Sequence, residues 1–158
     1  MTAGQLITLW TIRLACILYA AACAGWLTSR DKPARLAWTL AYFFYLMHLG
    51  AAFASYHHWS HQAAYRETAR QTAEIFGVRW GGGLYFNYVF TAVWGGDVFL
   101  RWLKVERSLP KWIPGAVHSF LAFMFFNATV VFASGWVRWF GITATLLLGI
   151  LWRQATRH

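Results

Sequence analysis

Acidic residues are scarce in this sequence. Five Asp and Glu stand against 14 Lys and Arg, and the four types together make up 12% of its 158 residues. Soluble domains carry about 25% charged residues. Apolar side chains take the place of the missing charge, because 59% of the residues are hydrophobic and 20% are aromatic. A soluble domain of this size lacks the interior to bury them, whereas Trp and Tyr collect at the two interfaces of a bilayer. The composition therefore predicts one integral membrane domain covering residues 1–158.

Cysteine is also rare, and several catalytic signatures are missing. Cys16 and Cys23 would lie about 10 Å apart on one helix, which is too far for a disulfide, so we expect both to be packing residues. The sequence contains no Cys-x-x-Cys pair, no Gly-rich loop followed by Lys-Ser or Lys-Thr, and no Gly-x-Ser-x-Gly. Its six histidines are too few for the histidine boxes of membrane di-iron hydroxylases and desaturases. The missing motifs argue against these classes of enzyme, but they do not indicate which other function the protein has.

The formal net charge of +9 is spread over short connections, and no uninterrupted run of Lys and Arg occurs. Aromatic residues between the cations belong to apolar stretches rather than to a base-stacking surface. We therefore expect a lipid bilayer with anionic headgroups as the partner of these charges, and no nucleic acid.

Five apolar stretches have the character of membrane-spanning helices, which need about 20 residues each. We expect the first to be a retained span rather than a cleaved leader, because no basic segment precedes it. The fifth is short, so a re-entrant or interfacial segment remains an alternative there. The fold class predicted is an all-α, polytopic transmembrane helix bundle. The spans cover about residues 6–28, 36–56, 84–103, 114–134 and 138–152.

The polar segment of residues 57–77 is predicted to form an outer amphipathic helix. It holds no Pro and no Gly before its last residue, and its Ala, Gln, Glu and Arg favour helix. Two courses are open: the second span projects straight into water, or the chain bends near the histidines and the helix lies in the interface. Trp59 and Tyr65 favour the interface.

The distribution of Lys and Arg predicts the orientation. If the N-terminus is outside, nine cations fall on the inner side and four on the outer side. The positive-inside rule then places the N-terminus outside and the C-terminus in the cytoplasm. The inner set is Arg30, Lys32, Arg35, Arg101, Lys104, Arg107, Lys111, Arg153 and Arg157, and the outer set is Arg66, Arg70, Arg79 and Arg138.

Three histidines, His57, His58 and His61, stand at the outer end of the second span. Imidazole is the commonest protein ligand of transition metals. On a continuous helix His57 and His61 differ by about 40° and would form the better metal-binding pair, with His58 turned to headgroups or to a neighbouring carboxylate. The alternative is an interfacial polar cap without metal. Further ligands would come from Glu67, Glu74, Asn87 or a partner chain.

Polar residues inside the predicted spans form a second group of candidates, because such residues are costly in lipid and often functional. His48 is a candidate haem or pigment ligand, or else a neutral imidazole bonded to a carbonyl. It lies about half a turn from His57, so it is not expected to share a metal with the cluster unless the helix breaks. Asp97 and His118 lie at similar depth on the inner side and are expected to pair, as interhelical contact or proton relay. A polar pocket in the outer half would be bounded by Arg13, His48, Asn87 and Asn127.

Two functional classes follow. In the first, the protein is a non-catalytic or accessory subunit of a larger membrane assembly, packing against other membrane subunits or copies of itself. Its small size and aromatic surfaces favour this class. In the second, it is a metal- or haem-dependent membrane protein whose outer histidines serve a redox, electron-transfer or metal-handling role. The sequence favours the first class.

Overall fold

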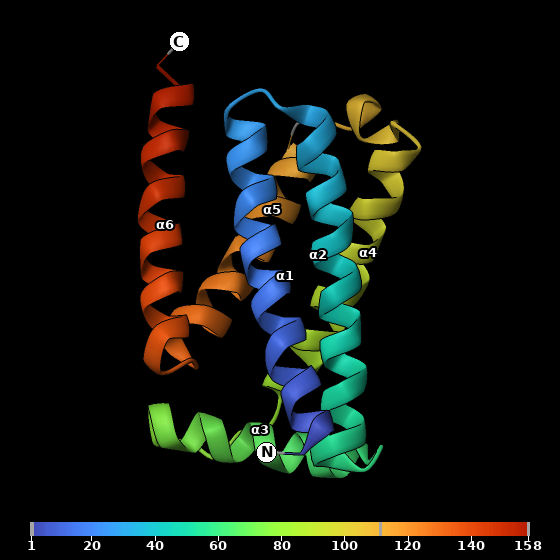
Figure 1. The fold of residues 1–158 in the computed structure, drawn as a ribbon, viewed down its shortest axis with the longest axis vertical. Coiled ribbons are helices and arrows are strands. Elements are labelled where there is room, and N and C mark those ends of the chain that lie inside the picture. The colour runs from blue at the N-terminus through green and yellow to red at the C-terminus, as the bar shows by residue number, and fades with distance from the viewer. Residues whose placement is uncertain (1, 111, 158) are drawn as a thin grey trace.

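The computed structural model describes residues 2–110 and 112–157, so that Lys111, counted above among the inner cations, lies outside them. The described residues form six α-helices and no β-strand (Figure 1), which confirms the all-α class. The helices are α1 (Ala3–Leu27), α2 (Asp31–Ala52), α3 (His61–Phe76), α4 (Gly83–Trp102), α5 (Trp112–Phe126) and α6 (Gly135–Ala155). Two of them continue as π-helical segments, α2 through Phe53–His57 and α5 through Asn127–Val131.

Four helical stretches are long and apolar enough to cross a membrane: Ala3–Leu27, Asp31–His57, Trp112–Val131 and Gly135–Ala155. The last of these covers the short fifth stretch, which is a helix of 21 residues. The third predicted span also forms a helix, α4, but α4 is not among these four.

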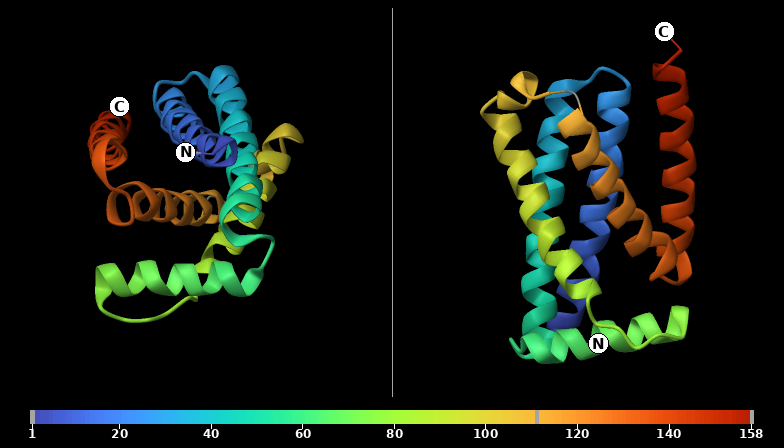
Figure 2. Two further views of the ribbon diagram at one scale, coloured as in Figure 1. Left: turned by 60° about the horizontal axis from the view of Figure 1, so that its bottom comes forward. Right: turned by 180° about the vertical axis from the view of Figure 1, so that it is seen from behind.

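The long helices stand side by side, while α3 lies across one end of the bundle (Figures 1 and 2). The N-terminus lies at this end, which we call the α3 end. The connections from α1 to α2 and from α4 to α5 lie at the other end, which we call the opposite end, together with the C-terminus.

The bend that turns the chain into α3 is built by residues with left-handed backbone. His58 and Trp59 have φ values of 47° and 58°, a region that L-residues rarely adopt and that ends a helix. Ser60 then caps α3, because its side chain accepts a hydrogen bond from the backbone of Ala63. Gly77, with φ of 73°, ends the helix. Of the two courses left open by the sequence, the bend is therefore the one confirmed.

Aromatic side chains make up the centre of the core, where α1, α2, α4 and α5 meet. Tyr19 of α1 stacks on Phe125 of α5 with ring centroids 4.4 Å apart. The same ring meets Trp94 of α4 edge-on at 5.7 Å and Trp38 of α2 at 5.0 Å. Such pairs contribute about 0.5–1.5 kcal/mol each beyond the burial of their area. Some of the many aromatic residues of the sequence therefore hold four helices together in the core.

The last helix, α6, is packed only over the half that lies towards the α3 end. Its buried residues are Gly141 and Ala144, and no described residue from Thr145 onward is buried. Gly141 lies against Thr129 so closely that an added Cβ would be 2.6 Å from the Thr129 hydroxyl and 2.9 Å from its carbonyl oxygen. The attachment of α6 therefore requires a residue without a side chain at position 141.

Replacing Gly141 by Ala is expected to lower the free energy of unfolding by about 1–3 kcal/mol, because the added methyl group overpacks this contact. Gly149→Ala is the matched control, since an added Cβ there meets nothing within 4 Å. Thermal unfolding of both variants in detergent measures the difference. Equal midpoints for the two variants would contradict the contact.

Candidate functional site

A cavity of about 910 Å³ lies between α3 and the neighbouring ends of α1, α2 and α4. We call it the α3 cavity. Its walls are mixed in character, with apolar side chains such as Leu49, Phe53 and Leu84. The polar residues that line it come from five segments of the chain: Thr8, His48, His57, Arg66, Glu67, Thr68, Arg70, Gln71, Arg79 and Asn87.

His48 is half-buried in the wall of the α3 cavity, and one of its nitrogens is already engaged. Its Nδ1 lies 2.9 Å from the carbonyl oxygen of Thr8. A carbonyl oxygen only accepts, so Nδ1 carries the proton and donates it. In the neutral ring the lone pair is therefore on Nε2, the atom that a metal or haem iron would use.

The three clustered histidines are separated by the bend. His57 ends the π-helical segment and lines the α3 cavity, whereas His58 is exposed at the first left-handed residue. His61 begins α3, and its Nδ1 lies 2.9 Å from the hydroxyl of Tyr88 on α4. The expectation that His57 and His61 share one helix face is therefore wrong, because the helix ends between them.

The structure instead brings His48 and His57 to one cavity. A π-helical turn contains more residues than an α-helical turn, so the segment Phe53–His57 moves later residues around the helix axis. Even so, the described residues hold no group of three or more His, Cys, Asp or Glu side chains placed to bind a metal ion. A metal at His48 or His57 would need further ligands from a partner or a bound molecule.

Arg70 forms salt bridges with both carboxylates of α3, those of Glu67 and Glu74. Its Nε and NH2 groups donate to the two oxygens of Glu67 over 2.9 and 2.6 Å, and it also bonds Glu74. The hydrogen bond from Arg70 is the main reason why the pKa of Glu67 is lowered. Among the described residues, Arg66 and Arg79 form no salt bridge.

A second polar cluster lies towards the opposite end, around a nearly buried carboxylate. The indole Nε1 of Trp38 donates to Asp97 over 2.8 Å, and Nε of Arg101 donates to the same oxygen over 2.7 Å. The predicted pairing of Asp97 with His118 thus takes an indirect form, since Arg101 joins the two by placing its NH2 2.5 Å from His118 Nε2. A guanidinium only donates, so His118 accepts and is neutral in this arrangement.

The sequence predicts Arg101 only as one of the inner cations, inside the span of residues 84–103. Its signal is its spacing of four residues after Asp97, which puts both side chains on one helix face. The ring of Trp26 lies under the guanidinium, with 4.1 Å between the guanidinium carbon and the ring centroid, a cation–π contact.

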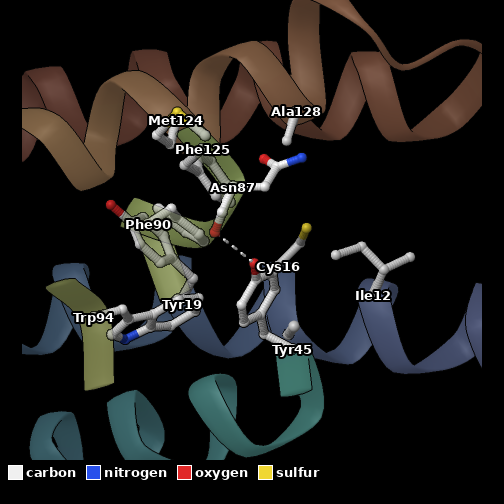
Figure 3. A pocket seen from close by; sticks show the side chains of 11 residues that line it. Ile12, Cys16, Tyr19, Tyr45, Asn87, Phe90, Trp94, Met124, Phe125 and Ala128 are labelled. Atoms are coloured by element: carbon white, nitrogen blue, oxygen red, sulfur yellow. Dashed lines mark hydrogen bonds between the residues drawn. The ribbon is translucent and has the colours of Figure 1, made fainter. Parts of the chain in front are cut away.

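A smaller cavity of about 80 Å³ lies inside the bundle, among Tyr19, Phe90, Trp94 and Phe125 (Figure 3). The hydroxyl of Tyr45 closes part of it by donating to a backbone carbonyl 3.5 Å away, drawn as the dashed line in Figure 3. Its lining is almost entirely apolar, so it offers room for a small apolar group rather than for acid–base chemistry.

The polar pocket expected from Arg13, His48, Asn87 and Asn127 does not form as a unit. His48 and Asn87 line the α3 cavity, whereas Arg13 is held between the rings of Trp10 and Trp136 at 5.0 and 4.7 Å. The Asn127 amide donates to the carbonyl of Phe123 over 2.8 Å. The Asn127 amide is thus satisfied by a local carbonyl, whereas the Nε of Arg13 is buried without a hydrogen-bond partner among the described residues.

No family model matches the chain, and no curated protein or solved structure matches it. The fold and composition define it as an all-helical protein with four helices long and apolar enough to cross a membrane.

The Asp97–Arg101–His118 cluster predicts strong coupling between its members. Asp97→Asn is expected to cost about 3 kcal/mol of stability, because it leaves Arg101 buried without a counter-charge. His118→Gln removes one interhelical contact and is expected to cost about 1 kcal/mol. Thermal unfolding of the single and double variants measures the coupling, which we expect to be non-additive because both changes act on Arg101.

The exposed pair Glu67–Arg70 is the matched control, with Glu67→Gln expected to cost less than about 1 kcal/mol. Additive effects of Asp97→Asn and His118→Gln would contradict the bridge through Arg101.

Proposed function

We propose that this chain is a multi-pass membrane protein that acts as a non-catalytic subunit of a larger membrane assembly. In this proposal five helices cross the bilayer, and α3 lies in the outer interface. The observation that supports the subunit role is the exposure of α6. This helix is long enough to cross a membrane, but none of the described residues in its second half is buried.

A crossing by α4 is supported by its direction and by its charged residues. It runs along α2 in both views of Figure 2, and its 20 residues give about the length that a bilayer requires. Its two charged residues, Asp97 and Arg101, have side chains that are 8% and 15% exposed. Turned into the bundle and paired, these charges do not face lipid. The two termini at opposite ends also agree with an odd number of crossings (Figure 1).

The orientation proposed is N-terminus outside and C-terminus in the cytoplasm. The four cations predicted to be outer lie in or near α3 and at the start of α6, towards the α3 end, and the inner cations outnumber them. This arrangement puts Trp59, which precedes α3, and the amphipathic α3 itself at the outer headgroups.

Reporters test this orientation directly. A reporter fused after His158 is expected to behave as cytoplasmic, and a tag inserted next to Thr72 is expected to be reached by an impermeant label from outside. Intact cells and cells with opened membranes provide the comparison. A reporter after His158 found outside would contradict the five crossings or the direction.

The partner proposed for α6 is a transmembrane helix of another subunit. Leu146, Leu147 and Ile150 are 64%, 55% and 54% exposed, which gives an apolar surface that either acyl chains or a partner helix would cover. Thr145 and Gly149 continue the four-residue spacing of small residues that begins at Gly141. Small residues at this spacing let two helices approach closely, which is how helices associate in lipid.

The polar groups elsewhere support a structural role over a catalytic one. Asp97 and Arg101 neutralise each other, His118 accepts a hydrogen bond from Arg101, and Arg70 binds the two glutamates of α3. These groups are bonded within the fold rather than directed at a common point where a substrate would react.

Replacing Gly149 by Leu is expected to break the assembly, because the larger side chain blocks close helix approach. Native gel electrophoresis after extraction in mild detergent should shift from the assembly to the single chain. Gly115→Leu on α5 is the matched control, since Gly115 is also an exposed helical glycine with no atom near an added Cβ.

Wild-type protein that runs as a single chain, and that forms no cross-link through α6 in native membranes, would overturn the subunit role. An assembly built of this chain alone would identify the partner as a second copy.

A further inference from the structure

The α3 cavity carries more positive charge than the protein neutralises. Its lining holds three arginines, Arg66, Arg70 and Arg79, against one carboxylate, that of Glu67, a formal excess of two charges with the histidines neutral. Glu67 is bonded by Arg70. Arg66 and Arg79 are exposed and form no salt bridge among the described residues, so both guanidinium groups are available to an anion.

The rest of the acidic residues do not offer one. Of the five in the sequence, only Glu67 and Glu74 belong to α3, and both are bonded to Arg70. Asp31 begins α2, Asp97 lies in the second half of α4, and Glu106 follows α4. These three belong to the opposite half of the bundle. Among the described residues, no carboxylate therefore pairs with Arg66 or Arg79.

The polarity of the cavity indicates the kind of anion. Arg66 and Arg79 come from α3 and the connection after it, whereas Leu49, Phe53 and Leu84 come from the long helices beneath. A ligand that fits both walls has an anionic end and an apolar remainder. A volume of about 910 Å³ is also far larger than a small inorganic ion requires.

We propose that the α3 cavity binds the phosphate headgroup of an anionic membrane phospholipid, with Arg66 and Arg79 as the phosphate-binding residues. The planar guanidinium group donates two parallel hydrogen bonds to phosphate oxygens. The first carbons of the acyl chains pass along Phe53 and Leu84 towards the bilayer. This site rests on the membrane placement proposed for α3 and is independent of α6 and its partner.

Lipid titration of the purified, delipidated full-length chain tests this site. Phosphatidylglycerol, phosphatidylcholine and free glycerol phosphate are added separately in a non-ionic detergent, and native mass spectrometry counts bound molecules. Phosphatidylglycerol is expected to bind about tenfold more tightly than phosphatidylcholine. Both carry a phosphodiester, but the cationic choline group cancels its charge in phosphatidylcholine and is repelled by Arg66 and Arg79. Glycerol phosphate is expected to bind more weakly still, because it lacks the apolar part.

Single changes Arg66→Gln and Arg79→Gln are each expected to weaken phosphatidylglycerol binding about tenfold, and the double change should remove the preference over phosphatidylcholine. Arg66→Lys keeps the positive charge but not the pair of parallel hydrogen bonds, so it should lose less phosphatidylglycerol affinity than Arg66→Gln. Arg138→Gln is the matched control. It changes an exposed arginine at the start of α6 that is not part of the α3 cavity lining, and it should bind like the wild type.

Equal binding of the two lipids would overturn the proposal, and so would an equal loss from Arg138→Gln. Glycerol phosphate binding as tightly as phosphatidylglycerol would assign the cavity to a soluble phosphate compound instead. Because lipid binding is measured on the purified chain, a failure of the α6 assembly leaves this result unaffected.

Discussion

The guanidinium group of Arg101 is the point on which the packing of four helices depends. It bonds Asp97 within α4 and His118 on α5, and it rests on the ring of Trp26 from α1. Trp38 of α2 joins through the same carboxylate. Burying a guanidinium group costs free energy unless its N–H groups have hydrogen-bond acceptors and its charge has a partner. The helices are therefore fixed in rotation as well as in distance, since a turn of any one would expose this charge.

The sequence predicts the helices better than it predicts the site. The apolar stretches and the polar break at residues 57–77 give the all-α class because period, length and breakers are local properties. The relation of His48 to His57 is not local. It depends on a π-helical segment that carries no composition signal, and so two residues expected to lie apart line one cavity.

Two other predictions differ from the structure because they depend on contacts with residues far away in the sequence. Arg13 was expected to bound a polar pocket, but Trp136 of α6 holds it by its aromatic face. Asp97 and His118 were expected to meet directly because of their similar depth, but the described residues show no hydrogen bond between them, and each is bonded to Arg101. The four-residue spacing predicts that Arg101 can reach Asp97. Only the structure shows that Arg101 also bonds His118 and so lies between the two residues.

The partial attachment of α6 bears on how the chain is assembled during synthesis. Every buried member of the aromatic core comes from α1, α2, α4 or α5, and Phe140 of α6 is only partly buried against it. The helices that supply the buried residues are therefore all synthesised before α6. Domains form from the N-terminus onward as they are made. Helix α6 then joins these helices through Gly141, while no described residue of its second half becomes buried.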